Sequence, residues 1–174
     1  MMDSMARVMS FNVNGIRARL HQIEKVLEQH KPDILGLQEI KVSDEEFPVE
    51  AITALGYNVD FFGQKGHYGV ALLSKIQATT IIRGFPSDDE DAQRRMIHGE
   101  YLLNGRVLHV INGYFPQGES RKHPTKFPAK EKYYSDLIHY ISDAFTAIDN
   151  VVVMGDMNIA ATDADVGIKP ENAK

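Results

Sequence analysis

The sequence contains no cysteine and no tryptophan. Without Cys, the chain can form neither a disulfide framework nor a thiolate zinc site, and it has no cysteine nucleophile. No apolar run approaches the roughly 20 residues needed to cross a bilayer, and residues 1–10 carry no apolar signal-peptide core. We therefore expect a cytoplasmic protein without membrane contact that relies on oxygen or imidazole chemistry.

The composition is typical of one folded domain. The chain has 174 residues, of which 43% are hydrophobic and 25% charged, and no repeat or Gly/Ser-rich linker divides it. We therefore predict that residues 1–174 belong to a single domain. Its net charge of −5 weighs against a general polyanion binder, although affinity for phosphate depends on where the charges lie.

Charge is concentrated in two segments. Residues 121–132 carry five Lys or Arg side chains and one Glu, a local charge of +4, whereas residues 88–91 are all acidic. Such runs are most often solvated loops, so they predict no function by themselves.

The apolar pattern predicts an α/β order with an antiparallel middle. Helical spacing indicates helices ending before Pro32 and beginning near Pro128, and a capping box at Ser43 and Glu46 predicts a helix that runs to Gly56. The pair at 104–105, Asn-Gly, indicates a two-residue hairpin. Strands are predicted over residues 7–11, 33–38, 57–62, 70–73, 78–82, 96–102, 107–112 and 151–154.

Four of these strands run directly into polar or phenolic side chains, namely Asn12, Glu39, Tyr114, and the pair Asp156 and Asn158. If the carboxyl ends of these strands lie together, the side chains converge where α/β proteins usually bind ligands. Each residue also has a structural alternative. Asn12 could be a turn former, Glu39 an exposed loop residue, Tyr114 a core residue, and Asp156 with Asn158 an Asx turn or a helix cap.

A pocket of this kind suits a hard cation. The seven His residues show no ligand spacing, so a zinc site is not expected. A few carboxylate and amide oxygens suit Mg²⁺, which keeps several waters and binds substrate phosphate. The residue types therefore predict hydrolysis of a phosphate ester, with a carboxylate orienting water and amide and phenol donors stabilising the transition state.

Five longer strings resemble the exonuclease III family: residues 10–17 (SFNVNGIR), 37–41 (LQEIK), 63–71 (GQKGHYGVA), 111–120 (INGYFPQGES) and 155–159 (GDMNI). That family is part of the larger group of endonucleases, exonucleases and phosphatases, which includes deoxyribonuclease I and the inositol polyphosphate 5-phosphatases. The resemblance runs from Arg7 to about Gly167. It implies a four-layer α/β sandwich of two facing mixed sheets, as in deoxyribonuclease I.

The resemblance also implies roles for individual residues. Glu39 would be the principal ligand of Mg²⁺ or Mn²⁺, supported by Asn12. Tyr114 would contact the scissile phosphate or assist the leaving group, and Asp156 would activate the attacking water. Asn158 would position water and a phosphate oxygen, and both Asp156 and Asn158 would lie at the metal. One departure is at residue 14, which is Asn here where some relatives carry Asp.

Members of the family act on DNA in base excision repair. They incise 5′ to abasic sites, degrade duplex DNA from 3′ ends and remove blocked 3′ ends. The resemblance thus implies double-stranded DNA with abasic sites or 3′ ends as the partner, and a monomeric enzyme when complete. The residues expected to face DNA are Lys65, His67, Arg95, Gln117, Arg121 and Lys126.

Family chains are longer than this one, and their final third supplies an Asp that orients a His, as well as an Asp-His pair in which the His contacts the phosphate. We therefore expect residues 1–174 to form the N-terminal two-thirds of the domain, with an incomplete second sheet and an open edge. The polar stretch 167–174 favours a fragment. Two alternatives stay open: a phosphatase acting on a phosphorylated small molecule or lipid, and a truncated, non-catalytic DNA-binding fragment.

Overall fold

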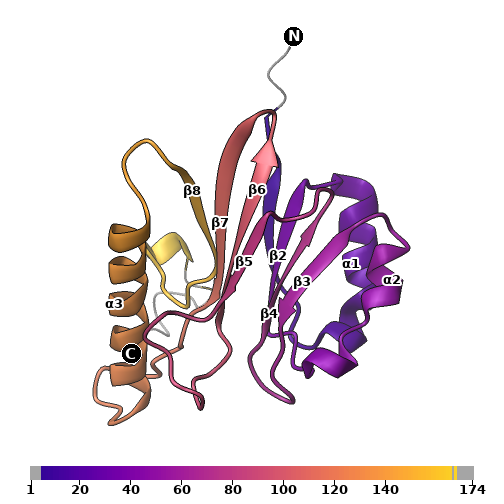
Figure 1. Cartoon of the computed structure of the whole chain (residues 1–174). Helices are drawn as coiled ribbons and strands as arrows, with labels where there is room; N and C mark the ends of the chain where they lie inside the picture. The colour runs from indigo at the N-terminus through magenta and orange to yellow at the C-terminus, as the bar shows by residue number, and fades with distance from the viewer. Residues whose placement is uncertain (1–4, 166, 168–174) are drawn as a thin grey trace.

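A computed structural model describes residues 5–165 and 167, and it shows the four layers expected from the sequence (Figure 1). The first sheet has the order β1-β2-β4-β3 and the second the order β5-β6-β7-β8. Each sheet is mixed, because β1 with β2 and β7 with β8 are parallel and the other pairs are antiparallel. The strands are β1 Val8–Asn12, β2 Ile34–Gln38, β3 Asn58–Phe62, β4 Val70–Ser74, β5 Thr80–Arg83, β6 Met96–Leu103, β7 Arg106–Tyr114 and β8 Asn150–Asp156.

Helices cover the two outer faces. Helix α1 (Ile16–His30) and the short helix α2 (Val49–Thr53) lie on the first sheet, and α3 (Lys126–Ala144) lies on the second (Figure 1). Two 3₁₀ turns, Asp44–Glu46 and Asp163–Asp165, complete the elements. None of the helices in the described part of the chain has the length and hydrophobicity of a membrane span.

The segment 43–56 differs from the prediction of one continuous helix. The capping box between Ser43 and Glu46 is present, but it opens only a single 3₁₀ turn. Phe47 leaves the helix with extended backbone, because a residue that precedes proline disfavours the helical conformation. Helix α2 therefore begins only after Pro48 and is five residues long.

Three apolar layers hold the sandwich together. Ile23 and Leu27 of α1 pack on the outer face of the first sheet, and Leu137 of α3 packs on the outer face of the second. Between the sheets, Leu72 and Val110 belong to one cluster of buried side chains. The predicted hairpin at residues 104–105 is confirmed, since Leu103 pairs with Arg106 across it.

A buried amide pair bridges the two sheets within the central layer. Asn112 of β7 donates from Nδ2 to the carbonyl oxygens of Leu37 and Ala71, both at 2.9 Å. Its Oδ1 accepts a bond of 2.6 Å from Gln38 Nε2. Gly36 makes room for this contact, because a Cβ there would lie 2.8 Å from Asn112 Cγ. We call this contact the Asn112–Gln38 bridge.

Strand β8 is an edge strand of the second sheet within the described residues. Its outward side chains Val151 and Val153 are only partly buried against the cluster beneath α3. This arrangement agrees with the open edge expected from the sequence.

The bridge predicts that Asn112→Leu is strongly destabilising. The substitution removes the side-chain donor to two buried carbonyl groups and the shortest of the bonds that Gln38 Nε2 makes, and a buried polar group that loses its partner costs about 1–3 kcal/mol. Urea denaturation should show a loss of at least about 3 kcal/mol in the free energy of unfolding. Asn150→Leu is the matched control, because that amide makes one exposed bond to Val107. Equal losses for the two variants would contradict the structural role of the bridge.

Candidate functional site

The polar side chains at the strand ends meet at one edge of the sandwich. Asn12 ends β1, and its Nδ2 donates to Glu39 Oε1 and to Asp156 Oδ2, each at 2.8 Å. Glu39 follows β2 of the first sheet, whereas Asp156 ends β8 of the second. The predicted convergence is confirmed, and a single amide joins carboxylates from both sheets.

The carboxylate of Glu39 interacts with three side chains of the site, those of Asn12, Lys41 and Tyr114. Its Oε2 pairs with Lys41 Nζ at 2.9 Å, and the Tyr114 phenol is hydrogen-bonded to the same carboxylate. Partial burial opposes ionisation, but the bonds from Asn12, Lys41 and Tyr114 outweigh it, so the pKa of Glu39 is lowered. Burial, together with the Glu39 charge, raises the pKa of Tyr114 to about 12. Glu39 is therefore ionised and Tyr114 protonated near neutral pH.

Three residues that follow strands β1 and β2 have left-handed backbone. The φ angles of Asn14, Glu39 and Lys41 are 43°, 53° and 56°. This conformation is unfavourable for Glu and Lys, and it persists only where the surroundings fix it. Backbone bonds do so here, from Gly15 N to Glu39 O at 2.7 Å and from Lys41 N to Tyr68 O at 3.0 Å. Lys41 was not predicted from the sequence, although it lies within the string at 37–41.

Asp156 and Asn158 form the Asx turn that was the structural alternative to a role in the site, and Asp156 also contacts Asn12. The Asn158 N–H donates to Asp156 Oδ1 at 3.2 Å, which is the Asx-turn contact. The Asn158 side chain donates to the carbonyl oxygen of Phe115 at 2.8 Å. Asp156 thus faces Asn12 through one oxygen, while Asn158 ties the segment to the loop after β7.

Arg95 forms part of the wall of the site. Its guanidinium lies over the rings of Tyr68 and Tyr114, at 4.1 and 4.7 Å from their centroids. It also donates to the Tyr114 carbonyl oxygen at 3.0 Å and to Gln93 Oε1 at 2.6 Å. Because its face is stacked, Arg95 helps to hold Tyr114 in place. Sequence spacing gave no signal for this contact.

The other residues expected at DNA lie at the surface of the protein. Lys65, His67, Gln117 and Arg121 are exposed, and Lys126 is exposed but ion-paired with Glu119. The basic segment is not one loop, because α3 begins at Lys126. Its last two cations already have partners: Lys130 donates to the Asn158 carbonyl oxygen at 2.6 Å, and Lys132 pairs with Asp136 at 2.6 Å.

The two carboxylates give the site a donor set suited to a divalent cation. Glu39 and Asp156 share the Asn12 amide donor, and hard oxygen ligands are those that Mg²⁺ prefers.

Elsewhere, His98 Nε2 and His109 Nδ1 lie 3.1 Å apart beneath α3. Across residues 5–165 and 167, no group of three or more His, Asp or Glu side chains is arranged to hold a metal.

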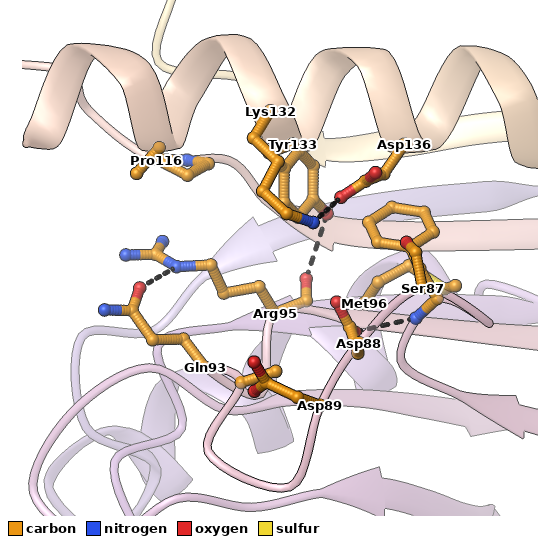
Figure 2. A pocket seen from close by; sticks show the side chains of 13 residues that line it. Ser87, Asp88, Asp89, Gln93, Arg95, Met96, Pro116, Lys132, Tyr133 and Asp136 are labelled. Carbon is orange, nitrogen blue, oxygen red and sulfur yellow. Dashed lines mark hydrogen bonds and ion pairs between the residues drawn. The ribbon is translucent and has the colours of Figure 1, made fainter.

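A separate cavity of about 210 Å³ lies beside the site (Figure 2). It is open to solvent and is lined by α3 and the segment between β5 and β6, and it shares Arg95 with the site wall. Asp88, Asp136 and Lys132 line it, and Lys132 is ion-paired with Asp136. Glu39, Asp156 and Asn12 do not line this cavity, so it is distinct from the candidate site.

Residues 9–173 match the sequence profile of the Endonuclease/Exonuclease/phosphatase family. The chain belongs to this family. It is 55% identical to exodeoxyribonuclease III of Haemophilus influenzae over 168 residues, which cover 97% of this chain and 63% of that protein. It is 30% identical over 170 residues to recombination repair protein 1 of Drosophila melanogaster, covering 97% of this chain and 24% of that protein.

Solved structures of the family share the fold. An AP endonuclease from Archaeoglobus fulgidus matches with a TM-score of 0.83 and 36% identity, covering 96% of this chain and 62% of that one. The 3′ phosphatase NExo from Neisseria, bound to a product DNA hairpin, matches with a TM-score of 0.83 and 34% identity, covering 92% and 60%. The chain spans less than two thirds of the length of each of these relatives.

The site requires glycine directly before Asp156. Gly155 pairs with Gly113 across β7 and β8, and a Cβ at residue 155 would overlap the Gly113 carbonyl oxygen. Its φ of +141° is also unfavourable for other residues. We expect Gly155→Ala to lower the free energy of unfolding by at least about 2 kcal/mol more than Gly66→Ala.

Gly66→Ala is the matched control, because Gly66 also has positive φ, at +77°, but no heavy atom lies within 4 Å of the added Cβ. Urea denaturation of both variants makes the comparison. If both lose the same stability, backbone strain alone accounts for the cost and the close approach of the two strands does not.

Proposed function

We propose that the chain is part of a cytoplasmic, divalent-cation-dependent DNA phosphodiesterase of the exodeoxyribonuclease III type. One observation carries this proposal: Asn12 lies 2.8 Å from a carboxylate of each sheet, which brings Glu39 and Asp156 into one site. The 55% identity to exodeoxyribonuclease III supports DNA as the substrate. Residues 1–174 would form part of one such domain, because the relatives extend beyond the matched region.

Glu39 and Asp156, with Asn12 and Asn158, would hold Mg²⁺ or Mn²⁺, and the cation would neutralise charge on the phosphate oxygens. Asp156 would also accept the proton of the attacking water. Tyr114, whose phenol is protonated near neutral pH, would donate to a phosphate oxygen or to the leaving group.

Double-stranded DNA with abasic sites or 3′ ends would lie across this edge of the sandwich. Lys65, His67, Gln117 and Arg121 are exposed and would contact the backbone together with Lys126. Arg95 would present the guanidinium edge that Tyr68 and Tyr114 leave open. Contacts of this kind position a duplex without reading its sequence. The complete enzyme would act as a monomer.

Removal of 3′ phosphates is a second candidate activity at the same site. It is favoured by the structural likeness to the Neisseria protein described as a 3′ phosphatase. A terminal phosphate monoester would need the same cation and the same donors.

The test is cleavage of a duplex that carries one synthetic abasic site, in Mg²⁺ and in parallel with a chelator. Glu39→Gln should lower Mg²⁺-dependent incision by at least about 100-fold, because a neutral amide replaces the charged ligand. Glu28→Gln, at an exposed position near the C-terminal end of α1, should cleave as the parent does.

Unchanged incision by Glu39→Gln would refute the assignment. Hydrolysis of an inositol phosphate in place of DNA would favour the small-molecule phosphatase. DNA binding that falls steeply with salt, without cleavage by any variant, would favour a non-catalytic fragment.

A further inference from the structure

Helix α3 is hydrogen-bonded to the segment that carries Asp156 and Asn158. Lys130 Nζ donates to the Asn158 carbonyl oxygen at 2.6 Å, and Tyr134 Oη donates to the Met157 carbonyl oxygen at 2.8 Å. Lys130 and Tyr134 are four residues apart, so they lie on the same face of the helix. Two consecutive carbonyl groups after β8 are therefore held by one turn of α3.

The segment after β8 cannot shift without disturbing the site. Asn158 has a left-handed φ of 50°, and its N–H donates to Asp156 Oδ1 at 3.2 Å. Its side-chain amide donates to the Phe115 carbonyl oxygen at 2.8 Å. A movement of the Asn158 peptide would thus displace Asp156 on one side and the loop after β7 on the other.

The loop after β7 is shaped to let Lys130 reach this carbonyl. A Cβ on Gly118 would lie 2.8 Å from Lys130 Cδ, so any other residue there would require the lysine stem to shift. The Phe115 ring packs on Tyr134 with centroids 5.0 Å apart. Both segments that frame the site are therefore anchored to the same face of α3.

The position of Lys130 argues against a role at the DNA backbone. Lys130 belongs to the basic segment 121–132, but its side chain is half-buried and its ammonium group donates to a backbone carbonyl. Lys122 of the same segment is exposed. One of the three ammonium donors of Lys130 is thus committed to the protein backbone, in a charge-assisted hydrogen bond that is stronger than a neutral one.

We propose that Lys130, assisted by Tyr134, is a positioning residue that fixes Asp156 and Asn158 in the site and does not bind DNA phosphate. Its effect on catalysis rests on the proposed function, but its effect on the segment after β8 does not.

The first test is hydrogen exchange at the Asn158 amide, which is bonded to Asp156. Lys130→Met keeps the apolar stem and removes the ammonium group, so exchange at this amide should accelerate at least about tenfold. Lys130→Arg retains a donor and should restore slow exchange, and Lys122→Met should match the parent. The amide of Val110, in the central core, should exchange equally in all variants if the fold is intact.

The second test separates positioning from phosphate binding on duplex DNA. Lys130→Met should lower kcat by about tenfold or more while KM and the salt dependence of binding stay unchanged. A fall of about 0.9 in the slope of log affinity against log salt would instead identify a phosphate contact and overturn the proposal. Unchanged exchange at the Asn158 amide would also overturn it. If no variant cleaves DNA, the proposed function fails, and hydrogen exchange still decides the role of Lys130.

Discussion

Two sheets can build one site only if they keep a fixed alignment, and the Asn112–Gln38 bridge supplies that constraint. A buried amide is costly unless its donors and acceptor are all satisfied, and here three bonds are made together across the central layer. Gln38 directly precedes Glu39, and Asn112 lies two residues before Tyr114. The contact that aligns the sheets therefore also aligns the two halves of the site.

The electrostatics of the site follow from this alignment. Asn12 can reach Glu39 and Asp156 together only because β1 and β8 end at the same edge. Lys41 offsets part of the charge of these carboxylates, and a pKa of about 12 keeps Tyr114 a hydrogen-bond donor. The result is a pair of carboxylates with the cations Lys41 and Arg95 and a neutral phenol donor beside them, a set that is complementary to a divalent cation and a phosphate group.

Most of the fold and the centre of the site could be predicted from sequence because both depend on local patterns. Strand periodicity placed Asn12, Glu39 and Asp156 at strand ends, and the carboxyl ends of parallel strands meet at one edge. The capping box at Ser43 could not show how soon Pro48 would end the helix. The orientation of the Lys130 side chain toward the Asn158 carbonyl oxygen depends on how closely α3 approaches the segment after β8, and no local sequence pattern encodes that distance.

The central claim is that side chains of both sheets form one cation site, and paramagnetic broadening by Mn²⁺ tests it most directly. In a titration followed by amide NMR, we expect Ile40 after β2 and Met157 after β8 to broaden at the same Mn²⁺ concentration. Glu39→Gln should remove both effects together. Broadening confined to one of the two sheets, or appearing first at the acidic segment 88–91, would contradict a shared site.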